Sequence, residues 1–448
     1  MDGASVQTNQ ERMRIHTDSA GISMHNVREA AFRILSKCGS AEQYSNIALD
    51  TALQRGDFSP SDRGLLTTLV YGTLERQLTL DHCIRALSQR KENDIDNDTR
   101  ILLRLGLYQL AYLDRIPDHA AVNETVALAP KRSRAFVNAL LRAFLRADKK
   151  LPLPDPVNAP IDYLSVRYSF HPDICRTFCD EYGFDRAESL LHAFCIRAPL
   201  TLRVNTLRIT RDRLLQKLTD AGYEPKPTLE CDTGIVLEST PVTALPGFEE
   251  GWFFVQDEAS QLCVEALDAF PDASVLDVCA CPGSKSFGAA ADMQNTGHLI
   301  SCDLHANKLS LVHRGALRLG ISILQTEARD AREYRADWDA SFDRVLCDVP
   351  CSGFGVFAKK PELRYKDPQK SETLPDIQLA ILENAARYVK PGGRLVYSTC
   401  TLLARENHEN VKRFLSAHDD YTLLRQRTLF PDTDGTDGFY FAVLERKK

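Results

Sequence analysis

The sequence contains no run of 18 or more apolar residues, the length that a membrane-spanning helix needs. Its first 25 residues are polar and lack the apolar core of a signal peptide. We therefore expect a soluble, cytoplasmic protein that does not bind membranes. At 448 residues the chain is too long for one ordinary hydrophobic core, so two or three domains are expected.

A zinc-type cysteine pattern is also missing. The chain has 13 cysteines, among them the close pairs Cys279 with Cys281 and Cys175 with Cys179, but no second pair or histidine pair completes a four-ligand spacing. No small cysteine-rich segment of the kind that disulfides staple is present. The sequence predicts no metal site and a reducing compartment, where thiols act as small apolar residues or as nucleophiles.

The chain lacks a positive net charge. Its net charge is −6, and this argues against indiscriminate binding to nucleic acid. Residues 25–150 nevertheless hold 19 Lys and Arg against 15 Asp and Glu, so this part is mildly basic. The asymmetry is compatible with a module that faces RNA. A solvated surface is the simpler explanation of any single charge in it.

Hydrophobic periodicity divides the chain into five segments, which together predict a multidomain protein. Residues 1–24 have no periodicity and predict a loose tail, whereas residues 25–148 have helical spacing and predict an all-α domain. Residues 149–160 contain four prolines and suit a semi-rigid linker. Residues 161–250 predict a small α+β subdomain. Strands and helices alternate over residues 251–448, which predicts a Rossmann-like α/β domain with a mostly parallel sheet.

The expected strands of this α/β domain lie at 274–278, 298–303, 323–327, 344–349 and 394–400. The expected helices lie at 284–293, 306–319, 374–389 and 405–417. A closing pair of strands, 422–429 and 439–444, would add an antiparallel edge to the sheet.

A loop of small residues follows the first of these strands and opens the next helix. It contains one glycine, Gly283, in place of the G-x-G-x-x-G that a dinucleotide pyrophosphate needs, so a dehydrogenase is disfavoured. Asp303 and Asp330 follow the next two strands, where carboxylates can bind a ribose and an adenine. A helix cap or a solvated turn would explain either acid alone equally well.

The loop and the acids favour a nucleoside ligand without phosphate, and S-adenosylmethionine is the predicted cofactor. The predicted cofactor-binding residues are Cys279, Ala280, Cys281, Pro282, Gly283, Ser284, Lys285, Asp303, Asp330 and Asp348.

Two strand ends each carry a cysteine, Cys351 in D-V-P-C and Cys400 in Y-S-T-C. Ligands of open α/β sheets bind beyond the carboxyl ends of strands, so both thiols and Asp348 are well placed for chemistry. A thiolate is a strong nucleophile, and a nearby cation, for which Lys285 is the candidate, lowers the thiol pKa. We predict Cys400, Cys351, Asp348 and Lys285 as catalytic residues. These residues alone do not decide which thiol attacks.

The strings D-V-C-A-C-P-G-S-K, D-V-P-C-S-G-F-G and Y-S-T-C-T, with Glu406-Asn407 and D-G-F-Y at 437–440, resemble those of RNA cytosine-5 methyltransferases over roughly residues 160–448. Four strings, at 69–76, 105–110, 116–126 and 136–142, resemble the NusB-like RNA-binding domain. The whole chain is similar to bacterial 16S ribosomal RNA cytosine-5 methyltransferases of the Sun/Fmu type.

This resemblance implies methyl transfer from S-adenosylmethionine to carbon 5 of a cytosine in 16S (small-subunit) ribosomal RNA, through a covalent cysteine adduct at carbon 6. It implies that Cys400 is the nucleophile and that Cys351 assists product release. Ribosomal RNA is the expected partner, and we expect a monomer. The alternatives are transfer-RNA cytosine methylation, an amino-methyltransferase on the same fold and non-catalytic RNA binding. An amino-methyltransferase typically has N-P-P-Y or D-P-P-Y where this chain has D-V-P-C. The NusB-like domain favours ribosomal RNA, and a pure binding module has no need of two exposed thiols.

The sequence departs from the family pattern in the cofactor loop at Cys281, Ser284 and Ser286, where the loss of a glycine at Ser284 suggests a tighter or shifted backbone. Lys359-Lys360 stands where arginines are more usual, and Tyr365 where Trp is frequent. Arg203 and Asn205 resemble the family's arginine–asparagine motif, although an edge strand with an exposed Arg explains them as well. Gly72 and Gly106 in the helical part can equally mark close helix contacts.

Overall fold

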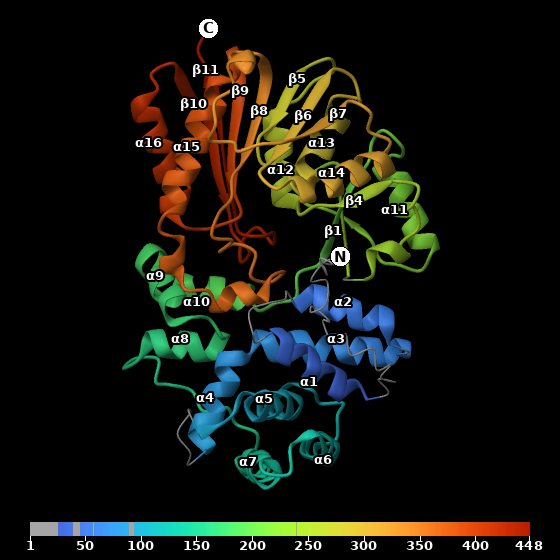
Figure 1. The fold of residues 1–448 in the computed structure, drawn as a ribbon, viewed down its shortest axis with the longest axis vertical. Helices are drawn as coiled ribbons and strands as arrows, with labels where there is room; N and C mark the ends of the chain where they lie inside the picture. Colours follow the sequence, from blue (N-terminus) through green and yellow to red (C-terminus); the bar gives the residue numbers. More distant parts are fainter. Residues whose placement is uncertain (1–25, 39–44, 57, 89–93, 239) are drawn as a thin grey trace, which may run out of the picture. The chain divides into compact units, whose positions relative to one another are not determined.

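The computed structural model describes residues 26–38, 45–56, 58–88, 94–238 and 240–448 (Figure 1). The chain forms two compact units, one of Met1–Thr73 with Arg90–Lys149 and one of Leu74–Gln89 with Lys150–Lys448. Among the residues that the structure describes, no helix is both long and apolar enough to cross a membrane.

The first unit is all helical, as predicted. Its helices are α1 (Val27–Cys38), α2 (Ser45–Arg55), α3 (Pro60–Glu75, whose last two residues belong to the second unit), α5 (Asn97–Tyr112), α6 (Asp118–Leu128) and α7 (Arg134–Arg146). A Cβ atom on Gly72 would overlap the Tyr108 hydroxyl, and one on Gly106 would lie 2.9 Å from Leu141. Both glycines therefore mark close helix contacts.

Four helices of the second unit precede its first strand in the sequence. They are α4 (Gln77–Leu87), α8 (Pro160–Tyr168), α9 (Pro172–Tyr182) and α10 (Phe184–Ala193). Helix α4 packs on α8, since the Leu78 amide donates to Ser169 Oγ at 2.9 Å and Thr79 Oγ1 donates to the Val166 carbonyl at 2.5 Å. A helix that lies inside the predicted domain 25–148 is thus part of the second unit.

The small α+β part of the second unit is a four-stranded sheet in the order β2-β3-β1-β4 with helix α11 (Arg211–Asp220). The strands are β1 (Leu200–Val204), β2 (Lys226–Pro227), β3 (Gly234–Leu237) and β4 (Phe253–Val255). The sequence predicts strands at 200–204 and 234–237, which match β1 and β3, whereas β2 and β4 are too short to give an alternating pattern.

Arg203 on β1 is buried, so the interpretation of an exposed arginine is wrong. Its Nη2 donates to Asp292 Oδ1 at 2.9 Å, and Nδ2 of Asn205 donates to the carbonyls of Gly251 and Leu319 at 2.8 and 2.9 Å. These contacts join the small sheet to the helices of the α/β domain. Because an ionised side chain is buried only when it is paired, the motif has a structural explanation.

The α/β domain contains a seven-stranded sheet in the order β10-β11-β9-β8-β5-β6-β7. The strands are β5 (Ser274–Asp277), β6 (His298–Asp303), β7 (Leu324–Ala328), β8 (Phe342–Asp348), β9 (Val389–Thr399), β10 (Tyr421–Leu429) and β11 (Phe439–Arg446). The five strands from β9 to β7 are mutually parallel, and β11 and β10 pair antiparallel at the end. The predicted mostly parallel sheet with an antiparallel edge is confirmed.

Helices cover both faces of this sheet (Figure 1). The core on one face includes α12 (Glu258–Leu267), α13 (Ser284–Asp292) and α14 (Ala306–Leu319), against Val275, Leu346 and Val396. The other includes α15 (Leu374–Arg387) and α16 (His408–Ala417), against Leu276, Val345 and Leu395. The strand residues that face the two cores are sequence neighbours because successive strand side chains point to opposite faces.

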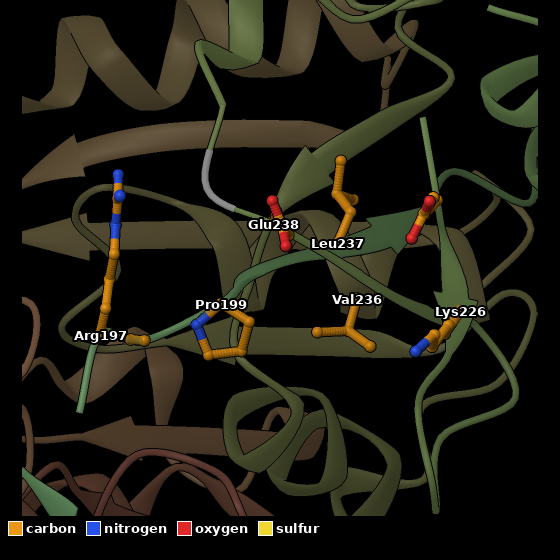
Figure 2. A pocket seen from close by; sticks show the side chains of 8 residues that line it. Arg197, Pro199, Lys226, Val236, Leu237 and Glu238 are labelled. Atoms are coloured by element: carbon orange, nitrogen blue, oxygen red, sulfur yellow. The ribbon is translucent and has the colours of Figure 1, made fainter. Parts of the chain in front are cut away.

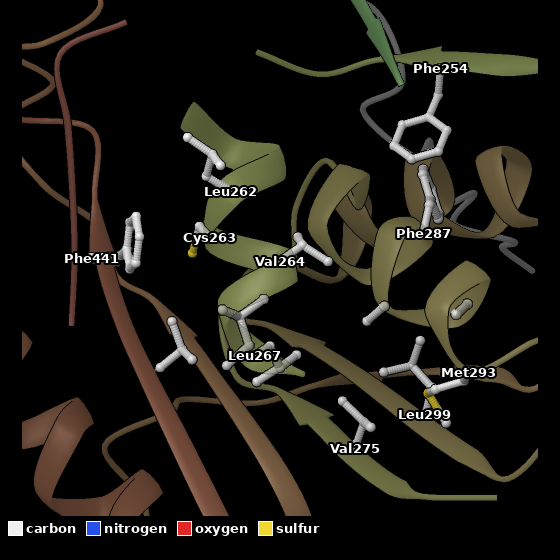
Figure 3. Packing of buried hydrophobic residues seen from close by; sticks show 14 of the residues in the cluster. Phe254, Leu262, Cys263, Val264, Leu267, Val275, Phe287, Met293, Leu299 and Phe441 are labelled. Carbon is white, nitrogen blue, oxygen red and sulfur yellow. The ribbon is translucent and has the colours of Figure 1, made fainter. Parts of the chain in front are cut away.

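Helix α13, which opens directly after the cofactor loop, is held by apolar packing on the first face. Figure 3 shows Phe287 of α13 against Phe254, with ring centroids 5.8 Å apart in an edge-to-face arrangement. Met293 and Leu299 continue the same cluster toward Val275 of β5. The start of α13 is therefore fixed relative to the strand ends.

One helix and two element boundaries differ from the predictions. Helix α12, capped by the Asp257 side chain, was not predicted. Strand β9 begins at Val389, five residues before the expected strand 394–400, and its Arg394 aligns with Arg344 of β8. Residues 404–406 form a 3-10 turn, η6 (Ala404–Glu406), and α16 starts only at His408.

Candidate active site

The carboxyl ends of β8 and β9 bring the two predicted thiols together. The strands are parallel neighbours, with Asp348 opposite Ser398, so the loops that follow them leave the sheet side by side. The Sγ atoms of Cys351 and Cys400 lie 3.2 Å apart and share a hydrogen bond. One thiol can therefore donate a hydrogen bond to the sulfur of the other.

A part-buried ion pair lies at the same end of the sheet. Lys285 Nζ donates to Asp348 Oδ2 at 2.8 Å, and the Ser398 hydroxyl donates to Asp348 Oδ1 at 2.7 Å. The Lys285 ammonium also lies over the Phe439 ring, 5.0 Å from its centroid. Burial opposes the charge of Lys285, but Asp348 outweighs it and raises the pKa of the ammonium. Lys285 is thus a permanent cation beside the thiols.

The surroundings of the two thiols differ in charge. The hydrogen bond from Cys351 lowers the pKa of Cys400, burial and Asp348 oppose this shift, and Lys285 and Lys360 support it. The hydrogen bond to Cys400, burial and the charge of Glu406 raise the pKa of Cys351. The cations favour a thiolate at Cys400, and the shared proton stays on Cys351.

Backbone contacts fix the loops that carry the thiols. The Gly355 amide donates to the Cys400 carbonyl at 3.0 Å, and the Gly438 amide donates to the Gly355 carbonyl at 2.8 Å. A Cβ atom on Gly355 would overlap the Gly438 carbonyl oxygen. Gly355 and Gly438 therefore allow the segments that contain Gly355, Cys400 and Gly438 to approach one another closely.

The cofactor loop is organised by Asp277, the last residue of β5, which is 1% exposed. Its carboxylate accepts from the Ser286 hydroxyl at 2.6 Å and from the Cys279 amide at 3.3 Å, and Ser301 donates to Ser286 at 2.8 Å. Burial raises the pKa of Asp277 to about 7. The departure at Ser286 is accommodated because its hydroxyl completes this chain of hydrogen bonds.

The turn of the loop falls on Gly283, whose φ of +111° lies in the region that favours glycine. A Cβ atom there would lie 2.6 Å from the Phe287 ring. Ser284 is the first residue of α13 and needs no such backbone, so the departure at Ser284 does not tighten the turn. The loop leaves its backbone open to a ligand at the start of a helix.

The two predicted ribose and adenine acids have local partners. Asp303 Oδ1 accepts from the His305 amide at 2.9 Å, and burial together with Asp303 raises the pKa of Cys281 to about 12. Asp330 Oδ2 accepts from Arg332 Nη2 at 2.5 Å, and this guanidinium lowers the pKa of Asp330. Asp303 is the last residue of β6 and Asp330 lies two residues after β7, on the edge of the parallel sheet that also carries Asp277 and Asp348.

Sequence reasoning missed the partners that hold the thiol loops. Ser398 lies in the Y-S-T-C motif without an assigned role, Glu406 was noted only as part of a motif, and Gln378 gave no signal on its helix. The Glu406 carboxylate is buried and accepts from Gln378 Nε2 at 2.8 Å. Such pairs join residues far apart in the chain, and a single sequence contains no record of them.

The two remaining departures have structural explanations. Lys359 Nζ donates to Asp257 at 2.6 Å and to Asp437 at 2.7 Å. The Tyr365 hydroxyl donates to the Leu74 carbonyl and shares a hydrogen bond with Ser169 Oγ at 3.0 Å. Both side chains anchor the segment that follows Cys351, and neither contacts the thiols.

A pocket of about 520 Å³ lies in the small α+β part of the second unit (Figure 2). Its lining residues are Arg197, Ala198, Pro199, Glu224, Lys226, Val236, Leu237 and Glu238. Two cations and two carboxylates offset each other there, so the lining selects no charge. Among the residues that the structure describes, no group of three or more His, Cys, Asp or Glu is arranged to hold a metal ion.

Three family models match the chain in succession. The NusB family matches residues 25–146, a ferredoxin-like domain of RsmF/B-like methyltransferases matches residues 173–243, and 16S rRNA methyltransferase RsmB/F matches residues 264–445. The crystal structure of PH0851 has the same fold, with a TM-score of 0.78, 24% identity, and coverage of 93% of this chain and 98% of that chain.

NSun6 from Pyrococcus horikoshii, solved with SFG, covers 63% of this chain and 99% of its own, with a TM-score of 0.58 and 20% identity. The ribosomal RNA small subunit methyltransferase B of Pseudomonas putida is 34% identical over 94% of this chain and 98% of its own. The probable ribosomal RNA small subunit methyltransferase B of Bacillus subtilis is 36% identical over 94% of this chain and 99% of its own.

These relatives extend over nearly the full length of the chain, across both the helical and the α/β parts. The chain belongs to the 16S ribosomal RNA methyltransferases of the small subunit methyltransferase B family, which methylate ribosomal RNA with a cofactor of the S-adenosylmethionine type.

Proposed function

We propose that this protein transfers a methyl group from S-adenosylmethionine to carbon 5 of a cytosine in 16S ribosomal RNA, through a covalent adduct of Cys400 at carbon 6. The observation that carries the proposal is the thiol pair, with 3.2 Å between the sulfurs, beside the Lys285–Asp348 ion pair. A methyltransferase that acts on a nucleophilic nitrogen or oxygen has no need of such a pair.

Carbon 5 of cytosine is a poor nucleophile, and a thiolate changes that. The Cys400 thiolate adds to carbon 6 and forms a carbon–sulfur bond, which leaves an electron pair available at carbon 5. Carbon 5 then accepts the methyl group, a base removes the carbon-5 proton, and elimination breaks the carbon–sulfur bond. One hard step becomes several easier ones, and the thiolate returns to its starting state.

Asp348 is the residue that we propose to hold the cytosine. Its two oxygens accept one hydrogen bond each, from Ser398 and Lys285, and each carboxylate oxygen has a further lone pair. Asp348 can therefore accept from the exocyclic amine of the base while Lys285 and Ser398 keep the carboxylate in place. Lys285 also stabilises the thiolate of Cys400 and so serves both groups.

Cys351 is proposed to assist the elimination that frees the product. Its sulfur is next to the attacking sulfur, and its raised pKa keeps the thiol protonated while Cys400 is ionised. The thiol can donate a hydrogen bond to the Cys400 sulfur as the carbon–sulfur bond breaks, and this stabilises the departing thiolate while the proton stays on Cys351. The roles of the two cysteines are therefore different, and their substitutions should fail differently.

S-adenosylmethionine supplies an electrophilic methyl group when it is bound. Residues 279–285 present an open backbone at the start of α13, and a side chain at Gly283 would close this turn against Phe287. We propose that Asp303 binds the ribose hydroxyls and that Asp330 reaches the adenine. The S-adenosylmethionine analogue SFG in the NSun6 structure supports a cofactor of this type.

The helical residues 25–148 are proposed to add affinity for RNA. Contacts to phosphates release counterions, so this part of the affinity should fall as the salt concentration rises. The same chain carries every group named for the chemistry, so a monomer suffices.

The test separates the thiols. Purified wild type, Cys400→Ser and Cys351→Ala are incubated with labelled 16S ribosomal RNA and S-adenosylmethionine, then run on a denaturing gel. Cys400→Ser should form no adduct and transfer no methyl group, since a hydroxyl is far less ionised than a thiol. Cys351→Ala should methylate once and stall as a protein–RNA band that survives heating in detergent.

A stalled band with Cys400→Ser and none with Cys351→Ala would reverse the two roles. Mapping of 5-methylcytosine in RNA from cells with and without the gene tests the substrate. Loss of a methylated cytosine from transfer RNA, with 16S ribosomal RNA unchanged, would contradict the proposed substrate.

A further inference from the structure

A buried carboxylate holds the loop that carries Cys351. Glu406 is 0% exposed, and its Oε2 accepts from the Ser352 amide at 2.9 Å and from Gln378 Nε2 at 2.8 Å. Gln378 Nε2 also donates to the Pro350 carbonyl at 3.0 Å. Glu406 and Gln378 therefore form hydrogen bonds with the backbone on both sides of Cys351.

The same residue is tied to the loop of Cys400. The Tyr397 hydroxyl donates to the Glu406 carbonyl at 2.6 Å, three residues before the thiol. Directly after the thiol, Thr401 Oγ1 shares a hydrogen bond of 2.8 Å with Ser352 Oγ. Glu406 thus belongs to a polar network that fixes the two thiol loops to each other.

One feature of Glu406 has no structural explanation in this network. Its Oε1 is buried and has no hydrogen-bond partner within the part of the chain that the structure describes. A buried, unpaired carboxylate oxygen destabilises the folded state. A glutamine could accept from the Ser352 amide through one oxygen, so holding the loop does not require a carboxylate.

We propose that Glu406 is a positioning residue that makes the two thiols unequal, because its carboxylate fixes the Cys351 loop and places a negative charge beside Cys351. The proposal deepens the function proposed above, on which its catalytic meaning rests. The proton that the pair shares is directed to Cys351, and Cys400 remains free to attack.

The charged groups around the pair agree with this assignment. Cys400 is faced by the cations Lys285 and Lys360 and by Asp348, whereas Cys351 is faced by Glu406 and by the sulfur of Cys400. Glu181 from α9 also lies near Glu406, and burial raises the pKa of its carboxyl to about 7, so it carries only part of a negative charge near neutral pH. Loss of the Glu406 charge would leave the cations near Cys400 as the main remaining source of asymmetry.

The test needs neither RNA nor cofactor. The full-length protein is treated briefly with iodoacetamide near neutral pH, and the alkylated fractions of Cys400 and Cys351 are measured by peptide mass spectrometry. Wild type should be alkylated mainly at Cys400. Glu406→Gln should lower the ratio of Cys400 to Cys351 labelling by roughly tenfold, the effect of about one pKa unit. An unchanged ratio would overturn the proposal.

Thr401→Val is the matched control, because it removes the hydrogen bond to Ser352 at nearly constant shape and leaves the Glu406 charge in place. Its labelling ratio should stay near that of wild type. A shift in Thr401→Val as large as that in Glu406→Gln would mean that loop mobility, and not charge, separates the thiols, which contradicts the proposal.

If Glu406→Gln does not fold, single-thiol chains give the answer. In Cys400→Ala the alkylation midpoint of Cys351 should lie at least about one pH unit above that of Cys400 in Cys351→Ala. Equal midpoints would overturn the proposal. Since no methyl transfer is measured, the expected ratios can be found even if the RNA product is not 5-methylcytosine, so the two proposals fail separately.

Discussion

The ends of β8 and β9 and the ends of β6 and β7 lie on the same edge of one sheet, but they are stabilised in different ways. At the thiol end, Asp348 is held by Lys285 from α13 and by Ser398 from β9, which are 63 and 50 residues away in the chain. At the ends of β6 and β7, where we propose that the cofactor binds and which we call the cofactor end, Asp303 and Asp330 find their partners only two residues away, in the His305 amide and the Arg332 guanidinium.

The difference separates two tasks. In the mechanism that we propose, bond formation at carbon 6 needs groups that stay in place, and long-range, part-buried contacts can supply this preorganisation. A ligand that must bind and leave needs acceptors whose present partners are weak or easily shared, and an exposed ion pair contributes little. We therefore expect substitutions at the thiol end to reduce the rate of methyl transfer, and those at the cofactor end to change affinity modestly.

The largest effect is expected for Lys285→Met. The substitution keeps the length of the side chain but removes the cation from both Asp348 and Cys400. Loss of one preorganised group should lower the single-turnover rate of methyl transfer about 100-fold or more. The pH midpoint of Cys400 alkylation should rise in the same variant.

Lys285→Arg is the control for this prediction, because it retains the positive charge. It should keep the low alkylation midpoint of Cys400 even where its altered geometry slows the transfer. If Lys285→Met alkylates with the wild-type midpoint, Lys285 does not stabilise the thiolate and the thiol end is less preorganised than we infer.

The next prediction concerns Asp277 on β5, the strand between the two ends. Its pKa is raised to about 7 by burial, so between pH 4 and 7 the folded chain binds more protons there than the unfolded chain. This group makes stability fall as the pH rises through that window. Asp277→Asn removes the effect, and its free energy of unfolding relative to wild type should rise with pH by a few kcal/mol.

Urea unfolding of both proteins at pH 4.5, 5.5 and 7.5 checks this. The hydroxyls of Ser286 and Ser301 can reverse their hydrogen bonds, so an asparagine amide can be accommodated at position 277. A difference between the two proteins that does not change with pH would show that Asp277 is already ionised in the folded chain.

The sequence was sufficient for the parts of this site that local signals determine. Apolar runs that end in Asp277, Asp303 and Asp348 predicted the strand ends, and the short motifs predicted that thiols lie there. It also predicted a helical domain over residues 25–148, but not that α4 of this stretch packs on α8 through contacts near Ser169. A helical period identifies the buried face of a helix but not the element that covers it.

The same limit applies inside the site. Asp348 and Lys285 were both predicted, but not their ion pair, because their contact joins two elements 63 residues apart. Glu406 belongs to a sequence motif but had no predicted role. Its Oε1 oxygen is buried and unpaired, and this can be recognised only once the surrounding residues are placed. Conversely, the sequence leaves open whether Arg203 is exposed on an edge strand, whereas the structure buries it against Asp292.

At the cofactor end, Asp303→Ala should weaken S-adenosylmethionine binding about tenfold, which corresponds to about 1.4 kcal/mol. The variant loses the carboxylate that we assign to the ribose and the acceptor for the His305 amide. Isothermal titration calorimetry measures the affinity. Thermal unfolding without ligand separates the two losses, since only the second destabilises the free protein, and an unchanged affinity would mean that another group binds the ribose.

The smallest effect is expected for Arg332→Ala. Arg332 is half exposed and pairs with Asp330, so its removal frees Asp330 Oδ2, while Oδ1 keeps its hydrogen bond from the backbone amide of residue 332. If Asp330 reaches the adenine, the variant should bind S-adenosylmethionine with an affinity within about threefold of wild type, as expected for the loss of a surface ion pair. Asp330→Ala should bind more weakly than Arg332→Ala. A loss in Arg332→Ala that exceeds the loss in Asp303→Ala would show that Arg332 itself holds the ligand, and the cofactor end would then rely on a fixed partner as the thiol end does.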